Sequence, residues 1–485
     1  MTIDKEIQQN KKDLNRKAAI AGAFFVFTQL LVRGVTFLAT PLYTRLLSTA
    51  QYGEVRVYES WLLIIVPVLS LSLYKSVTRA KFDFKNEYNE YVSSVQGLSY
   101  FVIAGCFLII TLLFRNQVMT FMGLDILMYV YLILYTFAYT SIWYYQTRER
   151  QMLRYRKSVT LTVCMMLPAT VLSIILLFLG NKSGHFDKLV DLRVIGYYSP
   201  QIIGGLVVAF IIWRQGNNKI DRKYWKYALA FSLPLIPETL SIQIMNQSDK
   251  IMIQKMAGNE STGIFALATT ISFIIWIIED AVWGAWLPWL YEKIDRKEIS
   301  DIQKPWTYMA CAFGYFSWAL VIMAPELISI LGGSKYREAI YLVSPMVTGT
   351  LFRFFGYSFT AVENYQKKTA FCGLGTMIAM VINVILNAIC IKYIGYQAAA
   401  YTTAASYFIL LIIQGFLEKK VCGMRCVSLS KTLLMSLAFW GINEITMFTF
   451  DISPLIRFLM FIAISVLVLI MLYPGIKTII NQLRK

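Results

Sequence analysis

The sequence carries little charge for its length. Only 15% of its 485 residues are Asp, Glu, Lys or Arg, whereas roughly a quarter of a typical soluble domain is charged. Apolar residues make up 57% of the chain, which excludes a disordered polypeptide. So few charges cannot cover the surfaces of several soluble domains. The composition therefore favours a membrane-embedded protein. Each membrane span of such a protein needs about 20 apolar residues.

Residue patterns that support enzyme chemistry are also absent. His185 is the only histidine, and we interpret it as a solvated loop residue rather than a catalyst. The seven cysteines show no disulfide framework, and Cys422 and Cys426 share a basic loop that lacks the further ligands zinc requires. No complete phosphate-binding loop or hydrolase motif occurs. We therefore expect no enzyme activity, no metal site and no cofactor.

Long apolar runs dominate the remaining sequence. They predict an all-α, polytopic membrane protein with about 14 transmembrane helices, and no segment alternates like the strands of a membrane barrel. The predicted spans are residues 20–44, 57–77, 93–114, 126–145, 159–180, 194–213, 228–254, 263–287, 306–328, 339–361, 370–391, 397–417, 432–450 and 455–474.

The net charge of +18 has a topological explanation. Lys and Arg are scattered among short loops rather than gathered in a basic domain, so nucleic acid is not an expected partner. An even number of spans places both termini on one side. If that side is the cytoplasm, the inner loops and tails carry about three times as many Lys and Arg as the outer loops. We predict a multi-pass protein of the bacterial cytoplasmic (inner) membrane with both termini cytoplasmic. The first apolar run is too long for a signal-peptide core.

A weak internal repeat divides the chain. In Arg45–Gly53 and again in Lys255–Gly263, a basic residue precedes by eight positions a glycine that we expect to open the next helix. The pattern fits two six-helix halves, as in transporters built from repeats. The predicted parts are a cytoplasmic N-terminal tail (1–19), an N-lobe (20–213), a C-lobe (228–417), two additional C-terminal helices (432–474) and a cytoplasmic C-terminal tail (475–485). Pro234 and Pro237 predict a bent or broken segment.

Ionisable residues inside spans indicate function because each costs roughly 2.5–3.5 kcal/mol at the membrane centre. Arg33 lies at the predicted centre of the first span. Polar residues share its helical face, and they are Gln29, Thr36, Thr40 and Thr44. Such a stripe lines an aqueous cavity or packs against a polar helix, and we favour the cavity. The alternative for Arg33 is a structural bond to helix carbonyls or to an acid such as Glu59.

Three later spans carry further charges. The predicted substrate-binding cationic cavity consists of Arg33, Lys250, Arg353, Gln29, Gln243 and Asn246. A net positive cavity selects an anionic cargo. Glu279 and Asp249 are candidates for H⁺ or Na⁺ coupling, although a salt bridge to a nearby Lys or Arg would equally explain Glu279. Glu444 and Arg457 are expected to form a structural ion pair.

Several local motifs resemble one known family. They are Pro41–Gly53, Ser232–Leu235, Asp249-Lys250, Asn383–Asn387 and Gly395–Thr402. In their order and positions they are similar to segments of the polysaccharide flippases of the multidrug/oligosaccharidyl-lipid/polysaccharide exporter superfamily, and the resemblance covers nearly the whole chain. Asn383 and Asn387, four residues apart, are expected to form interhelical hydrogen bonds.

The resemblance implies a V-shaped molecule of two six-helix lobes. Its implied cargo is an undecaprenyl-diphosphate-linked oligosaccharide, moved to the outer leaflet by alternating access for lipopolysaccharide or capsule synthesis. The implied partners are this substrate, membrane lipids and glycan polymerase or assembly proteins. A cation-coupled multidrug antiporter and a peptidoglycan-precursor flippase of the same superfamily are the alternatives. A membrane glycan polymerase or ligase is disfavoured, because no predicted outer loop exceeds about 15 residues. No motif specifies the sugar, the polymer, the coupling ion or the oligomeric state.

Overall fold

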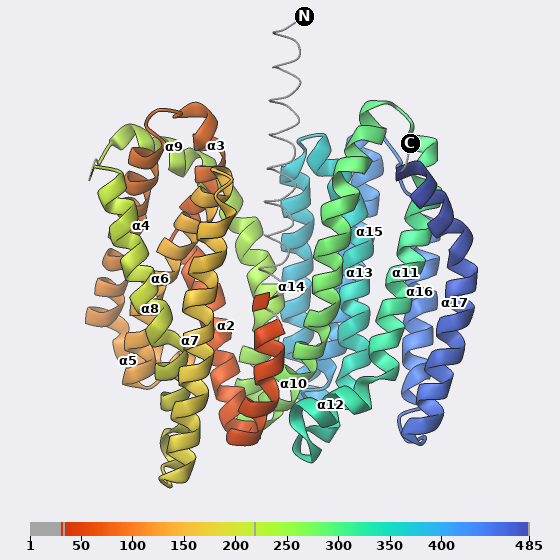
Figure 1. Ribbon diagram of the computed structural model, residues 1–485, viewed down its shortest axis with the longest axis horizontal. Helices are drawn as coiled ribbons and strands as arrows, with labels where there is room; N and C mark the ends of the chain where they lie inside the picture. The colour runs from red at the N-terminus through yellow and green to blue at the C-terminus, as the bar shows by residue number, and fades with distance from the viewer. Residues whose placement is uncertain (1–30, 33, 218–219, 484–485) are drawn as a thin grey trace, which may run out of the picture. The chain divides into compact units, whose positions relative to one another are not determined.

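The protein is helical throughout the part of the chain that the structure describes. A computed structural model describes residues 31–32, 34–217 and 220–483, and all regular elements within these ranges are helices. The predicted all-α class is confirmed. The chain divides into two compact units, residues 1–243 (unit 1) and 244–485 (unit 2), which are drawn from red to yellow-green and from green to blue in Figure 1.

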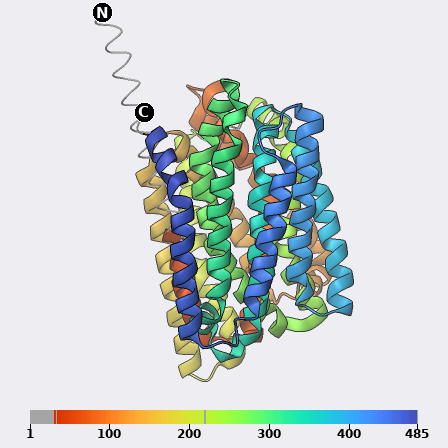
Figure 2. The ribbon, with the colours of Figure 1, turned by 90° about the vertical axis from the view of Figure 1, so that its right-hand side faces the viewer.

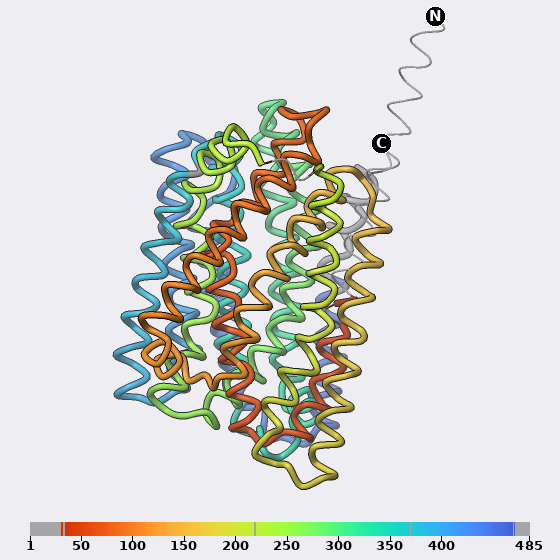
Figure 3. Tube along the Cα trace, turned by 90° about the vertical axis from the view of Figure 1, so that its left-hand side faces the viewer, coloured from red at the N-terminus to blue at the C-terminus, as the bar shows by residue number. Residues whose placement is uncertain are grey.

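The first described helical residues of unit 1 are 31–32 and 34–46, called the first helix below. The later helices of unit 1 are α2 (Thr49–Leu69), α3 (Ser76–Asp83), α4 (Tyr88–Ile109), α5 (Arg115–Met122), α6 (Ile126–Gln151), α7 (Tyr155–Lys182), α8 (Leu189–Gln215) and α9 (Arg222–Ser232). Helix α8 packs against both α6 and α7, and α7 and α8 lie side by side in Figure 3. A Cβ at Gly196 would lie 2.4 Å from the Cα of Ser173. Glycine thus permits the close approach of α8 to α7.

Helix α2 begins eight residues earlier than the predicted span. Ser48 caps it: its Oγ accepts a hydrogen bond from the Gln51 amide at 3.1 Å, and its own amide donates to Gln51 Oε1 at 3.0 Å. This reciprocal capping box satisfies two amides that the first turn leaves without helical partners. Residues 49–56 are therefore helical rather than part of a loop. At its other end α2 is followed, after a bend of 65°, by the helical segment Leu73–Asp83.

Helix α10 (Ile236–Asp295) is broken at Gly258. The backbone there has φ 87° and ψ 173°, a combination that essentially only glycine adopts. The break thus lies five residues before Gly263, the glycine that was expected to open the next helix. Upstream, the 3₁₀ turn Leu233–Leu235 interrupts the α-helical hydrogen bonding between α9 and α10, whereas the bend predicted from the two prolines stays a prediction. Unit 2 begins after Gln243, within α10.

The remaining helices belong to unit 2. They are α11 (Gln303–Ile322), α12 (Ala324–Gly332), α13 (Ile340–Tyr365), α14 (Thr369–Tyr393), α15 (Ala398–Leu417), α16 (Leu429–Met447) and α17 (Pro454–Leu483). Helix α15 packs between α13 and α14, whereas α16 and α17, blue in Figure 2, both pack against α11. Helices α13 and α15, together with α10, supply the lining of the unit 2 pocket described below.

The helices are long and apolar enough for a multi-pass membrane protein. Among the described residues eight helices qualify as candidate spans, or up to ten if each bent pair is one span. Within the described ranges, helices occupy the predicted segments, but the length and hydropathy of these helices do not confirm the count of about 14 spans. Large apolar side chains such as Phe101, Phe178 and Phe210 are exposed on the helices of unit 1, as expected of surfaces that face lipid.

One predicted ion pair is wrong. Arg457 pairs with Glu326 of α12 and donates to the carbonyl oxygens of Phe450 and Ile452. Glu444 instead accepts a hydrogen bond from Ser344 at 2.9 Å. The two residues were paired only by their predicted depth, whereas helix packing selects the neighbours.

Candidate functional site: a polar pocket in each unit

The unit 1 pocket is a partly open cavity of about 210 Å³ between the first helix, α2, α6, α7 and α8. Polar and aromatic side chains form much of its lining, and they are Thr36, Tyr43, Arg56, Glu59, Tyr135, Tyr139, Trp143, Thr170, Arg193, Tyr197 and Tyr198. The hydroxyls of Thr36, Thr40 and Thr44 donate to backbone oxygens of their own helix. Of these three threonines, only Thr36 is part of the lining.

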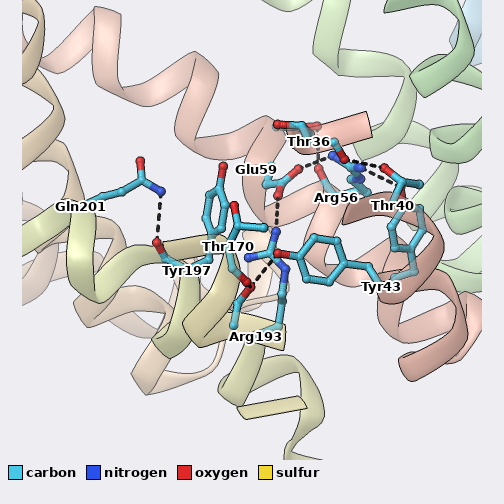
Figure 4. A network of polar contacts seen from close by, with 12 residues as sticks. Thr36, Thr40, Tyr43, Arg56, Glu59, Thr170, Arg193, Tyr197 and Gln201 are labelled. Atoms are coloured by element: carbon cyan, nitrogen blue, oxygen red, sulfur yellow. Dashed lines mark hydrogen bonds and ion pairs between the residues drawn. The ribbon is translucent and has the colours of Figure 1, made fainter. Parts of the chain in front are cut away.

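Glu59 lies between two guanidinium groups of this pocket (Figure 4). Arg56 Nη1 donates to Glu59 Oε2 at 2.8 Å, and Arg193 Nη2 lies 3.5 Å from Glu59 Oε1. Arg56 Nη2 also donates to the hydroxyl of Tyr52 at 2.6 Å. Two cations thus face one carboxylate, so the pocket has an excess of positive charge.

Arg193 is buried between two aromatic rings but is incompletely hydrogen-bonded. Only 5% of the residue is exposed, and its guanidinium carbon lies 4.2 Å from the centre of the Tyr43 ring and 4.1 Å from that of Tyr197. Among the described residues its Nη1 has no hydrogen-bond partner. A buried donor without an acceptor is costly, so this nitrogen keeps the capacity to donate one more hydrogen bond.

Three aromatic residues of α6 form a wall beside these charges. Tyr135, Tyr139 and Trp143 are spaced by four and therefore share a helix face. The rings of Tyr135 and Tyr139 stack with centroids 5.0 Å apart, and those of Tyr139 and Trp143 are 4.9 Å apart. Tyr135 is buried, whereas Tyr139 and Trp143 are partly exposed.

The unit 2 pocket is smaller, about 60 Å³. Helices α10, α13 and α15 supply its lining, whose polar members are Asn246, Gln247, Asp249, Lys250, Thr269, Ser272, Trp276, Thr350, Thr403 and Tyr407. Two of the predicted site residues of α10, Asn246 and Lys250, lie here together with Asp249. The hydroxyl of Tyr407 donates to Asn246 Oδ1 at 2.6 Å.

Asp249 is the centre of a buried hydrogen-bond network. Its Oδ1 accepts from Asn387 Nδ2 at 2.6 Å, and its Oδ2 accepts from Thr403 Oγ1 at 2.8 Å. Asn383 Nδ2 donates to Thr403 Oγ1 at 3.0 Å, and Thr402 donates to Asn387 Oδ1. The predicted interhelical bonding of Asn383 and Asn387 is thus confirmed. The network joins α10, α14 and α15 through side chains alone, and both oxygens of the Asp249 carboxylate accept a hydrogen bond.

The predicted cations of unit 2 have close polar partners. Lys250 is buried, and its Nζ donates to Gln247 Oε1 at 2.9 Å, whereas the adjacent Asp249 bonds to α14 and α15. Arg353 forms an ion pair with Glu279, and its guanidinium carbon lies 3.9 Å from the centre of the Trp276 ring. Arg353 and Glu279, predicted for cargo and ion binding respectively, therefore compensate each other's charge.

Five predicted residues are not among the lining residues of either pocket. Two of them, Arg353 and Glu279, form the ion pair described above, and the other three are Gln243, Gln29 and Arg33. Gln243 is half-buried on α10 and is the last residue of unit 1. Gln29 and Arg33 lie outside the described residues. The roles predicted for these three residues stay predictions.

Arg56 and Arg193 line the unit 1 pocket but were not among the predicted site residues. Arg56 was assigned to a loop because the predicted span began at residue 57, but Ser48 and Gln51 have the spacing of a capping box and would have placed the helix start correctly. Arg193 was assigned to an outer loop. No local signal identifies it, because its partners Tyr43 and Glu59 come from distant segments.

The described residues contain no group of three or more His, Cys, Asp or Glu arranged for a metal ion. Burial, then Glu418 and Cys422, raise the pKa of the Cys426 thiol to about 12. A thiol with so high a pKa stays protonated at neutral pH and is a poor ligand, because thiolates bind metals.

Comparison with known proteins places the chain in a family. A model of the family described as "Polysaccharide biosynthesis protein" matches residues 21–293, more than half of the chain. Protein 1 of the Lsg locus of Haemophilus influenzae is 24% identical over 393 residues, covering 77% of this chain and 92% of that protein. An uncharacterized membrane protein of the same organism is 23% identical and covers 73% and 87%.

Two solved structures share the fold. The lipid II flippase MurJ in an inward closed conformation has a TM-score of 0.64 and 15% identity, covering 94% of this chain and 99% of that chain. An inward-facing multidrug resistance MATE transporter of the MOP superfamily has a TM-score of 0.59 and 13% identity, covering 87% and 99%. The chain therefore belongs to the polysaccharide biosynthesis protein family and has the fold of the MOP superfamily of flippases and transporters.

Proposed function

We propose that the protein is a flippase that moves undecaprenyl-diphosphate-linked oligosaccharide across the cytoplasmic membrane by alternating access. The observation that carries this proposal is the unit 1 pocket, in which two guanidinium groups face one carboxylate beside an aromatic wall. A cationic site of this kind favours an anionic cargo over a cationic drug. Family membership supports a role in polysaccharide synthesis, where glycan polymerase or assembly proteins would take up the flipped units.

Recognition of the diphosphate would rely on arginine. A guanidinium group binds phosphate oxygens bidentately and stays charged at every physiological pH. Arg33 is our first choice because the sequence predicts it at the centre of the polar stripe in the first span. Lys250 and Arg353 are secondary choices, since each has a polar partner in unit 2. The amides of Gln29, Gln243 and Asn246 would complete the polar surface.

Coupling to an ion gradient would use Asp249. Its buried carboxylate accepts hydrogen bonds from Asn387 Nδ2 and Thr403 Oγ1, and a proton or a small hard cation would bind there by displacing one of these donors. Exchange of that ion would alter the network that joins α10, α14 and α15. Glu279 is the second candidate, and its ion pair with Arg353 would have to open first.

The proposed orientation places both termini in the cytoplasm. It follows from the excess of Lys and Arg in the loops assigned to that side. A C-terminal alkaline phosphatase fusion should be inactive and a C-terminal fluorescent protein fusion bright. The opposite pair of results would reverse the orientation without affecting the transport proposal.

The transport test uses the full chain in proteoliposomes that contain a fluorescent undecaprenyl-diphosphate-linked oligosaccharide. Flipping exposes the label to a membrane-impermeant quencher. Arg33→Ala should abolish flipping at normal protein abundance. Arg33→Lys should restore only part of the flipping, because the ammonium group of lysine keeps the charge but cannot form the bidentate hydrogen bonds of a planar guanidinium group. Arg115→Ala, which removes an exposed arginine of α5, is the matched control and should flip normally.

Three results would contradict the proposal. Normal flipping by a well-inserted Arg33→Ala variant would exclude the proposed contact between Arg33 and the diphosphate. Faster flipping of peptidoglycan precursor than of any undecaprenyl-diphosphate-linked oligosaccharide would favour the precursor flippase. Efflux of cationic dyes with no movement of either lipid would favour the multidrug antiporter.

A further inference from the structure

We propose that the unit 1 pocket is a saccharide subsite, in which one sugar ring with an anionic substituent lies between the α6 wall and Arg193. The inference rests on the proposed function, since it specifies which part of the lipid-linked cargo enters this pocket. It assigns ring recognition to Tyr139 and Trp143 and recognition of the anion to Arg193.

The size of the pocket fits one group of a larger ligand. Pockets for whole drug-sized ligands have roughly 300–1,000 Å³, whereas the unit 1 pocket has about 210 Å³. It is partly open, so the rest of a cargo molecule can continue outside it. A long lipid-linked oligosaccharide could therefore place a single ring here.

The α6 wall offers surfaces that suit a sugar ring. The face of an aromatic ring carries partial negative charge, and the C–H groups on one face of a pyranose carry partial positive charge. Tyr139 and Trp143 are partly exposed at the pocket, while Tyr135 behind them is buried and supports the stack. Three successive turns of α6 thus present a preformed aromatic surface.

Arg193 supplies the anion selectivity. Tyr43 and Tyr197 lie close to its guanidinium group, and Glu59 approaches only one of its terminal nitrogens. The other terminal nitrogen, Nη1, has no hydrogen-bond partner among the described residues although the side chain is buried. A carboxylate on a sugar would accept from it in a charge-assisted bond. Arg56 also lines the pocket, so the single carboxylate of Glu59 faces two guanidinium groups. One positive charge is therefore in excess and can attract an anionic ligand.

The anion could come from the sugar or from the diphosphate that links it to the lipid. The two sources are separated with three soluble probes, namely methyl β-glucuronide, methyl β-glucoside and inorganic diphosphate. Saturation-transfer NMR on the full-length protein in nanodiscs measures weak binding of each. We expect glucuronide to bind about tenfold more tightly than glucoside, as a hydrogen bond to a charged group would produce, and diphosphate not to displace it.

Variants assign the contacts. Arg193→Gln should remove the preference for glucuronide while glucoside binding persists. Trp143→Leu should lower the affinity for both glycosides by about threefold to tenfold, the range expected from loss of an aromatic contact. The matched controls are Arg115→Gln and Trp213→Leu, which change exposed residues of α5 and α8 outside the pocket, and both should bind like the unaltered protein.

Four results would overturn the inference. They are absence of glycoside binding, equal affinity for glucuronide and glucoside, displacement of glucuronide by diphosphate, and full glycoside binding by well-folded Trp143→Leu. Circular dichroism and elution as a single species identify variants that have lost their fold. If Arg193→Gln misfolds, Arg193→Lys replaces it and should keep part of the glucuronide preference, because the charge remains while the planar fork is lost.

The binding assay is independent of transport. If glycosides bind as expected while no lipid-linked oligosaccharide is flipped, the proposed function fails and the subsite stands. If flipping is normal and neither glycoside binds, the subsite fails and the proposed function stands.

Discussion

Unit 1 and unit 2 each contain an arginine that contacts both an aromatic ring and a glutamate. In unit 1, Arg193 lies against the rings of Tyr43 and Tyr197 and faces Glu59. In unit 2, Arg353 lies against the ring of Trp276 and pairs with Glu279. Each unit thus holds an arginine between an aromatic surface and a glutamate.

The surroundings of the two pairs differ. Unit 1 adds a second guanidinium group, that of Arg56, whereas unit 2 adds the adjacent Asp249 and Lys250 at its pocket. Positive charge is therefore in excess in unit 1 and balanced in unit 2. Under the proposed function, this difference predicts that the anionic cargo is recognised mainly in unit 1 and that the coupling ion binds in unit 2.

The largest expected effect comes from breaking the pair of unit 2. Arg353→Ala leaves the buried Glu279 without its ion pair, and removal of one partner of a buried pair typically costs about 3–5 kcal/mol. The free energy of unfolding, measured by denaturant titration in detergent, should fall by up to this amount.

A double variant tests the cause of that loss. Arg353→Met combined with Glu279→Gln removes both charges and should recover most of the stability. If the double variant is as unstable as Arg353→Ala, the ion pair is not responsible. If it is stable but no longer transports, the pair also takes part in function.

Asp249→Asn should separate ion coupling from cargo binding. The substitution keeps the side-chain shape but removes the charge that holds the ion, so gradient-driven transport should fall by about 10- to 100-fold. Glycoside binding by unit 1 should be unchanged. The control is Asp451→Asn at an exposed loop position, and transport by Asp249→Asn at the normal rate across a range of gradients would exclude this site.

Gly258→Ala should destabilise unit 2 by about 1–3 kcal/mol, since the φ of 87° at this position is strained for any residue with a Cβ. Gly284 lies in the same helix element, and a Cβ added there would meet open space, so Gly284→Ala should be neutral or slightly stabilising. Equal effects of the two substitutions on thermal unfolding would contradict a specific requirement at the helix break.

The smallest effect is expected at the corresponding corner of unit 1. Ser48→Ala removes the cap of α2 and should cost about 1 kcal/mol, whereas Ser48→Thr keeps the hydroxyl and should cost less. Thermal unfolding of the two variants measures the difference. A loss from Ser48→Thr that equals the loss from Ser48→Ala would show that the hydroxyl does not act as the cap.

The helices were predictable because an apolar run of sufficient length dictates a helix in a membrane wherever it packs. Their ends were less accurate, as α2 shows, because a cap depends on a few polar atoms rather than on the average composition of a segment. The second helix break was also misplaced, at Gly263 instead of Gly258, since both glycines look alike in sequence and only one has the unusual backbone conformation.

The charged residues within spans were also predictable from the sequence. An ionisable residue in an apolar run is easily recognised, and its energetic cost in the membrane indicates a specific role. That property identified Asp249, Lys250, Glu279 and Arg353, together with Arg33. Their partners were decided by packing. Asn387 lies 138 residues from Asp249 in the chain and yet bonds to its carboxylate, and Arg353 reaches Glu279 across 74 residues.

Sequence alone thus establishes an all-helical, membrane-type chain with charges inside it. Which charge is neutralised and which is left for a ligand depends on distances of a few ångströms between helices, and these exist only in the tertiary structure.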